Sequence, residues 1–227
     1  MMKSQYFRLF IIAVLLSGCD LEQYPQDTTS KEAVFGSEEG LEMYSYSFYT
    51  FLPTANNIHT ADGVSDFAAR RGAPAFLMDG AYSATSDDNT SASGNEVVAL
   101  GGDSNWGWTH LRNFNYFIEN CTYKSVPESV RNHYIGVARF FRAFFYFEKV
   151  KRYGDVPWIS TAIDVDDPDL YKGRDPRTLV MDEVLADLNF ACENITLTND
   201  ATRSLVTKWA AYALKARVCL FEGTFRK

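Results

Sequence analysis

The chain has 227 residues, of which 46% are hydrophobic and 15% are aromatic, so it can bury the core of one large domain or of two small ones. This composition excludes a generally disordered chain. The formal net charge of -7 argues against a nucleic-acid partner.

The first residues read MMKSQYFRLFIIAVLLSGC and have the pattern of an export signal. Lys3 and Arg8 supply a basic start, and the apolar stretch at 9–16 is too short to cross a bilayer core of ~30 Å as a helix. The ending LSGC is similar to a bacterial lipobox, in which the cysteine becomes lipid-modified. We therefore predict a lipoprotein signal peptide at residues 1–18 and lipidation at Cys19.

Residues 19–36 are predicted to form the lipidated N-terminus and a tether. Residues 20–30 are polar, contain one proline and show no apolar period, which is typical of a solvated linker. Acyl chains contribute ~0.8 kcal/mol per buried CH2, so several chains on Cys19 would anchor the protein to a membrane. We expect a lipid anchor in a membrane, and Asp20 and Glu22 do not by themselves decide whether the protein is sorted to the cell surface.

From about residue 37 onward the helical period dominates, and we predict an all-α fold with long irregular loops. Ser37 is the expected N-cap of the first helix, Asp175 the N-cap of the fourth with Pro176 after it, and Gly154 and Gly223 the stops of the third and fifth. The predicted helices span residues 37–51, about 105–122, about 127–153, 175–195 and about 205–222.

The third predicted helix carries six aromatic residues between positions 140 and 147, which leaves it almost no polar face. Other helices should therefore cover it on most sides. The glycines that end the third and fifth helices lie 69 residues apart, close to twice the roughly 34-residue tetratricopeptide period. The sequence thus predicts tetratricopeptide-like stacked helix pairs.

A polar segment at residues 83–95, SATSDDNTSASGN, is predicted to be an exposed loop. An EF-hand loop beginning at Asn89 would need a glutamate at its twelfth position, where the chain has Leu100. No metal site or cofactor is predicted, and only a less regular calcium site stays open. The cysteines beyond Cys19 form no Cys-x-x-Cys pair, and the apolar surroundings of Cys192 and Cys219 predict buried, inert thiols.

Three arginines fall inside the predicted aromatic helices, at positions 139, 142 and 217. A buried charge without a partner would cost several kcal/mol. We therefore expect these side chains to pair with acids such as Glu148 or Asp187, or with carbonyl groups at helix ends.

Three segments together resemble the SusD/RagB family of outer-membrane lipoproteins. They are WTHLRNFNYFIEN at 108–120, ARFFRAFFYFEKVKRYGDVP at 138–157 and TKWAAYALKARVCLFEG at 207–223. The resemblance identifies residues 37–227 as the N-terminal helical domain of that family. Its members are roughly twice as long or more, so the resemblance leads us to expect that the C-terminal part of the family fold is absent from this chain. The resemblance also implies a lipid anchor in the outer membrane, with the domain exposed at the cell surface.

The resemblance implies capture of a nutrient, most often an oligosaccharide, and its delivery to a TonB-dependent outer-membrane transporter of the SusC type. Sugar recognition needs flat apolar surface and planar hydrogen-bonding groups. Trp106, Asn105, Arg71 and Asp88 are accordingly the predicted ligand-binding residues, whereas Trp108 shares a stripe with Leu111 and is predicted to pack in the core.

Two other classes of protein compete with this interpretation. A helical-repeat adaptor lipoprotein that binds only a protein partner gains if Trp106 is buried. A surface glycosidase would need two carboxyl groups roughly 5 to 10 Å apart across a cleft, and the adjacent Asp87 and Asp88 do not offer that geometry. With no Gly-x-Ser-x-Gly, P-loop or His-Glu-x-x-His motif, the chain is predicted not to be an enzyme.

Overall fold

The computed structural model describes residues 30–55, 58 and 106–226, and from Lys31 onward these belong to one compact unit. The elements, in chain order, are α2 (Lys31–Phe35), α3 (Glu38–Tyr46), the 3-10 helix η1 (Ser47–Phe51), α7 (Thr109–Asn120), α8 (Glu128–Tyr153), the 3-10 helix η4 (Pro168–Tyr171), α9 (Arg177–Asn194) and α10 (Lys208–Phe225).

The predicted all-α fold is confirmed. The described residues contain no strand, and their single β-type pairing is an isolated bridge between Val156 and Asp175. Within the same residues, no helix is both long and apolar enough to cross a bilayer.

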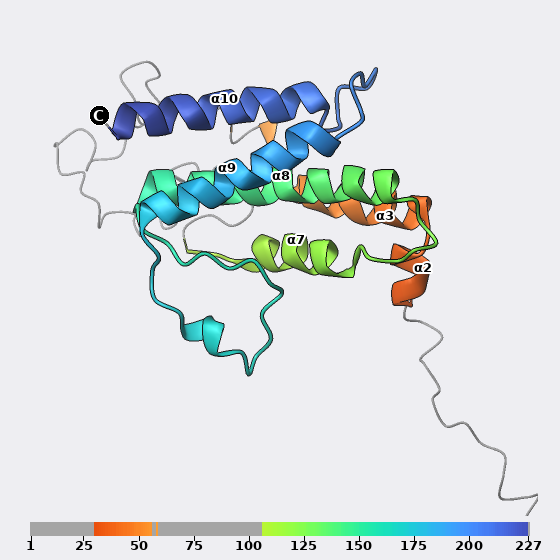
Figure 1. The fold of residues 1–227 in the computed structure, drawn as a ribbon, viewed down its shortest axis with the longest axis horizontal. Coiled ribbons are helices and arrows are strands. Elements are labelled where there is room, and N and C mark those ends of the chain that lie inside the picture. The colour runs from red at the N-terminus through yellow and green to blue at the C-terminus, as the bar shows by residue number, and fades with distance from the viewer. Residues whose placement is uncertain (1–29, 56–57, 59–105, 227) are drawn as a thin grey trace, which may run out of the picture. The chain divides into compact units, whose positions relative to one another are not determined.

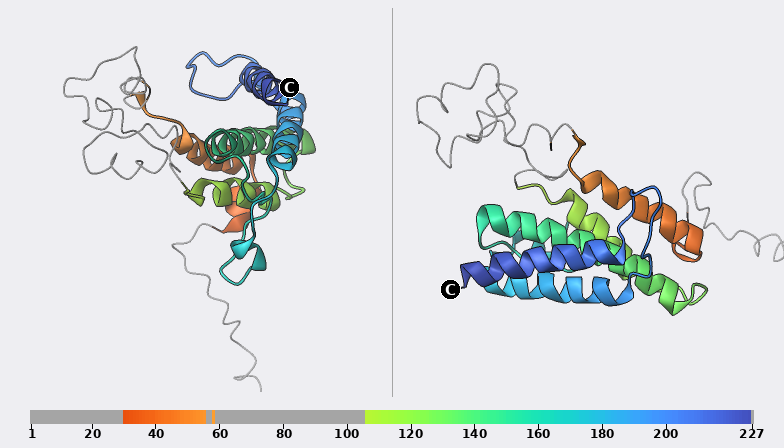
Figure 2. Two further views of the ribbon diagram at one scale, coloured as in Figure 1. Left: turned by 90° about the vertical axis from the view of Figure 1, so that its left-hand side faces the viewer. Right: turned by 90° about the horizontal axis from the view of Figure 1, so that it is seen from above.

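The long helix α8 lies at the centre of the bundle (Figure 1). It packs against α7 and α3 on one side and α9 on the other, and α10 packs mainly on α9. Consecutive long helices run antiparallel, and Figure 2 shows α9 and α10 side by side. This is the stacked arrangement of helix pairs that the sequence predicts.

The aromatic run of α8 fills the core, as its nearly apolar pattern requires. Phe141, Phe145 and Tyr146 are fully buried. Phe48 of η1 approaches Phe141 with 6.0 Å between ring centroids, and on the other side Phe147 meets Phe221 of α10 at 5.4 Å. The Phe147–Phe221 pair is edge-to-face, an arrangement that contributes roughly 0.5–1.5 kcal/mol beyond the area that it buries.

A buried ion pair fastens α10 to α9. The Arg177 guanidinium lies 2.6 Å from a Glu222 carboxylate oxygen, and its Cζ sits 3.3 Å from the centroid of the Phe225 ring. This second contact needs α10 to continue past Gly223, whereas the sequence predicts that the helix ends there. That predicted end is wrong: α10 continues to Phe225, three residues past the predicted end at 222, and Phe225 packs on Arg177.

The helix starts are only partly as predicted. Ser37 caps α3 by accepting a hydrogen bond from the Gly40 N–H at 3.1 Å. Asp175 does not cap α9, because its carboxylate accepts instead from the Trp158 N–H at 2.7 Å. The first free N–H of α9, that of Arg177, is bound by Asp155 Oδ1 at 2.8 Å.

The two short elements α2 and η4 are not anticipated by the sequence analysis. Helix α2 lies within the segment expected to be tether, and its Phe35 is buried against Tyr44 and Phe117. The first predicted helix, residues 37–51, is α3 continued by the tighter turn η1.

The outer face of α10 corrects two further predictions. Cys192 is buried as expected, but Cys219 is exposed. Arg217 is also exposed, and no ion pair joins it to any residue that the structure describes. Both residues are exposed on α10, although their neighbours in the sequence are largely apolar.

Gly154 ends α8 with φ +72° and ψ -110°, a conformation that side chains rarely adopt. We predict that Gly154→Ala lowers the free energy of unfolding by about 1–3 kcal/mol, measured by urea denaturation followed by circular dichroism. Gly223→Ala is the matched control, because a Cβ there meets nothing within 4 Å and a helical alanine gains roughly 0.5–1 kcal/mol. Equal losses in both variants would contradict the role assigned to Gly154.

Candidate functional site

A pocket of about 610 Å³ opens where three segments meet: the start of α7, the loop at residues 157–163 and the stretch from η4 to residue 174. Its volume falls within the roughly 300–1,000 Å³ of typical small-molecule sites. Most of its wall is apolar. The charged and amide side chains on its lining are those of Arg112, Asn115, Asp169, Lys172 and Arg174.

Trp106 lies on the lining of this pocket, and 42% of its surface is exposed. Two rings contact it nearly perpendicularly, Trp108 at 5.1 Å and Tyr153 at 4.9 Å between centroids. The Arg174 guanidinium carbon lies 4.8 Å from the Trp106 ring centroid, within the range of a cation–π contact. The ring is therefore held in place by its neighbours while much of it remains accessible to a ligand.

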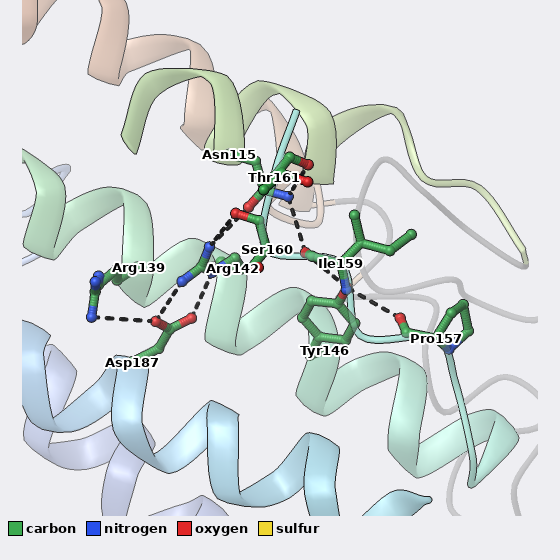
Figure 3. A network of polar contacts seen from close by, with 9 residues as sticks. All are labelled: Asn115, Arg139, Arg142, Tyr146, Pro157, Ile159, Ser160, Thr161 and Asp187. Carbon is green, nitrogen blue, oxygen red and sulfur yellow. Dashed lines mark hydrogen bonds and ion pairs between the residues drawn. The ribbon is translucent and has the colours of Figure 1, made fainter. Parts of the chain in front are cut away.

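The back wall of the pocket is tied to the core by the polar network in Figure 3. Arg142 binds Asp187 through two hydrogen bonds of 2.7 Å, and its Nη1 donates to Asn115 Oδ1 at 2.9 Å. The Asn115 amide in turn donates to the carbonyls of Ile159, at 3.0 Å, and Thr161, at 2.9 Å. This confirms the predicted pairing of Arg142 with Asp187, and it shows that Asn115 anchors the loop.

Tyr146 holds the same loop from α8. Its hydroxyl accepts from the Ile159 N–H at 2.7 Å and lies 3.2 Å from the Pro157 carbonyl, to which it can donate. Burial raises the pKa of Tyr146 well above its ordinary value, so the hydroxyl keeps its proton at any physiological pH. One side chain thus fixes two backbone groups of the wall.

The front of the loop is braced by charged side chains. Arg112 Nε donates to the Ile163 carbonyl at 3.1 Å, and Lys172 Nζ donates to the Trp158 carbonyl at 3.0 Å. Lys172 also pairs with Asp175 at 2.8 Å. Burial raises the pKa of Asp175, but the Lys172 ammonium and the Trp158 N–H outweigh it and hold this pKa below its ordinary value.

Of the residues predicted to bind ligand, Trp106 lies in this pocket. Asn105, Arg71, Asp88 and the lipidation site Cys19 lie outside the described residues. Trp108 packs against the core as predicted and also lines the pocket.

The remaining polar side chains of the lining are not among the predicted site residues. Asn115 gives the one local signal, as an amide in the apolar stripe of its helix. Arg112, Lys172 and Arg174 look like ordinary surface charges until the fold brings them together. Among the described residues, no group of three or more His, Cys, Asp or Glu side chains is placed to hold a metal ion.

Stacked helix pairs with a pocket beside α7 define an all-helical repeat domain. Comparison with known proteins identifies the family to which this domain belongs. A family model described as "Starch-binding associating with outer membrane" matches residues 26–220. The chain belongs to this SusD-like family.

SusD-like protein P2 of Formosa agariphila is 27% identical over 237 residues, covering all of this chain and 45% of that relative. Among solved structures, a SusD-like protein from Bacteroides fragilis has a TM-score of 0.66 at 24% identity, covering 90% of this chain and 39% of the other. Surface glycan-binding protein A from Bacteroides fluxus has a TM-score of 0.58 at 20% identity, covering 83% and 41%. The chain spans less than half the length of these relatives.

The pair Arg142–Asp187 yields a stability prediction. The two residues are 5% and 2% exposed, so Asp187→Leu leaves a buried guanidinium unpaired and should cost about 3–5 kcal/mol of unfolding free energy. The double variant Arg142→Met with Asp187→Leu should recover much of that loss, because the stranded charge is gone. Urea denaturation of both variants measures the difference.

Arg139→Met is the matched control for this measurement. Arg139 lies 3.8 Å from the same Asp187 carboxylate, but its side chain is 30% exposed, so its removal should cost less than about 1 kcal/mol. A loss in Asp187→Leu no larger than in Arg139→Met would show that the buried pair does not hold the fold.

Proposed function

We propose that this protein captures an oligosaccharide in the pocket beside Trp106 and passes it to a TonB-dependent outer-membrane transporter of the SusC type. The observation that carries the proposal is the exposed Trp106 ring, fixed by Trp108 and Tyr153 on the lining of a 610 Å³ pocket. Sugars offer flat apolar ring faces that stack on such a surface, and hydroxyl groups that bind amides and charged side chains.

The membership of the family supports a binding role rather than catalysis, since its description is that of a starch-binding group associating with the outer membrane. The relative from Bacteroides fluxus is named a surface glycan-binding protein. Within the proposal, Asn105, Arg71 and Asp88 contribute further contacts to the sugar.

The exposure of Trp106 also weighs against the adaptor alternative, which a buried Trp106 would have favoured. The proposal places the protein at the cell surface, with Cys19 carrying the lipid and residues 19–36 connecting it to the helical domain.

Trp106→Ala should weaken oligosaccharide binding by about 1–2 kcal/mol, or roughly 5- to 30-fold in Kd, because the stacking surface is lost. A glycan array followed by isothermal titration calorimetry on the array's best ligand measures this. Trp209→Ala is the matched control, since Trp209 is 61% exposed on α10 and does not line the pocket.

The two tryptophan variants separate the outcomes. Loss of binding in Trp106→Ala alone supports the pocket as the site. If the folded chain binds no glycan, or if Trp209→Ala loses as much affinity as Trp106→Ala, capture at this pocket is wrong.

The lipid anchor is tested separately. In cells fed an alkyne analogue of palmitate, the wild-type chain should incorporate the label and sediment with outer membranes, and Cys19→Ala should lose the label. Cys219→Ala, which removes an exposed thiol, is the control and should keep it. Labelling that persists in Cys19→Ala would place the lipid elsewhere.

A further inference from the structure

We infer that the ligand of the Trp106 pocket is an anionic oligosaccharide, one that carries carboxylate or sulfate groups; this inference rests on the proposed capture function. Its starting point is the charge of the pocket lining. Three cationic side chains, those of Arg112, Lys172 and Arg174, line the pocket with a single carboxylate, that of Asp169. The whole chain has the opposite balance, with a formal net charge of -7.

The three cations differ in what they already bind. Lys172 is compensated by Asp175, whose carboxylate lies 2.8 Å from its Nζ. Arg112 uses only Nε, toward the Ile163 carbonyl, and its two Nη groups have no hydrogen bond to any residue that the structure describes. The Lys172 ammonium is thus occupied by Asp175 and the Trp158 carbonyl, whereas most of the N–H donors of Arg112 are available to a ligand.

Arg174 is exposed, and among the described residues its guanidinium contacts the Trp106 ring. It forms no ion pair within that part of the chain. A guanidinium offers five N–H donors in a planar fork that matches carboxylate and sulfate oxygens in pairs. This fork lies over one face of the Trp106 ring. A pyranose on the exposed part of the indole can therefore place its acidic substituent against Arg174.

The start of α7 adds to the positive potential of the pocket. Its N-cap, Trp108, makes no side-chain capping hydrogen bond, and its first turn contains no acidic residue. Both Trp108 and the first helical residue, Thr109, line the pocket. The first N–H groups of a helix and its dipole favour a negative group at that end.

Asp169 is the one group that opposes an anion. It is exposed on η4, and it is outnumbered by the two guanidinium groups that lack a carboxylate partner among the described residues. A carboxylate in a sugar site also accepts hydrogen bonds from hydroxyls. The balance of the lining therefore favours an acidic sugar over a neutral one.

The test compares oligosaccharides that share a sugar backbone and differ in whether their substituents are charged. The purified chain is titrated by calorimetry with hexagalacturonate and its full methyl ester, and with a sulfated galactan oligosaccharide and its desulfated form. In at least one pair, the anionic member should bind at least about tenfold more tightly, since hydrogen bonds to charged groups contribute roughly 1.5–3 kcal/mol. That advantage should shrink as NaCl rises from 50 to 500 mM, because the two arginines are exposed to solvent.

Single substitutions test which arginines cause the preference for the anionic oligosaccharide. Arg174→Gln and Arg112→Gln should each weaken binding of the anionic member about tenfold more than binding of the neutral one. Arg217→Gln, which alters an exposed arginine on α10 outside the pocket, should change neither value.

The failure of this inference is distinguishable from that of the proposed function. If the neutral members bind as tightly as the anionic ones, or if Arg217→Gln reduces the preference as much as Arg174→Gln, the inference is overturned and glycan capture stands. If neither these probes nor the neutral glycans of the array bind to the folded chain, both are overturned.

Discussion

The buried pair of Arg142 and Asp187 couples the helix core to the wall of the pocket. Two charges removed from water cost more than their mutual attraction returns unless further hydrogen bonds satisfy them. Here Asn115 supplies a bond from α7, and the Ser160 carbonyl accepts from Arg142 at 3.3 Å. The loop at 157–161 is therefore part of what makes the buried charges tolerable, and its shape is fixed by the same bonds that join three helices (Figure 3).

A wall fixed in this way has a consequence for binding. Ordering a loop or side chains on association consumes interaction energy, and a site that is already ordered avoids that cost. The carbonyls at positions 157, 159 and 161 each already accept a hydrogen bond from Tyr146 or Asn115, which leaves them less capacity to bind a ligand. Under the proposed capture function, recognition therefore falls mainly to Trp106 and to the side chains of Arg112 and Arg174, which line the same pocket.

The long helices could be predicted because their signals are local: aromatic stripes, Ser37 before α3 and Gly154 after α8. Where the prediction failed, a distant partner competed for the same group. Asp175 has the right position to cap α9, yet the Trp158 N–H, 17 residues away, takes its carboxylate. Helix α2 was not anticipated because a five-residue segment has too little period to read, and its stability comes from Phe35 packing on rings far along the chain.

The pocket could be predicted only in part for a related reason. Trp106 stands out in the sequence because an aromatic residue beside a polar segment is unusual, and that is a local signal. Arg112 and Arg174 are 62 positions apart, and the loop after α8 must fold back on Asn115 and Tyr146 before both arginines line one space. The order of charged residues along the sequence does not say which of them share a surface. The net charge of the pocket lining is therefore a property of the tertiary fold. The proposal that a sugar is held at Trp106 therefore starts from the sequence, whereas the inference that this sugar is anionic depends on the fold, which brings Arg112 and Arg174 to one pocket.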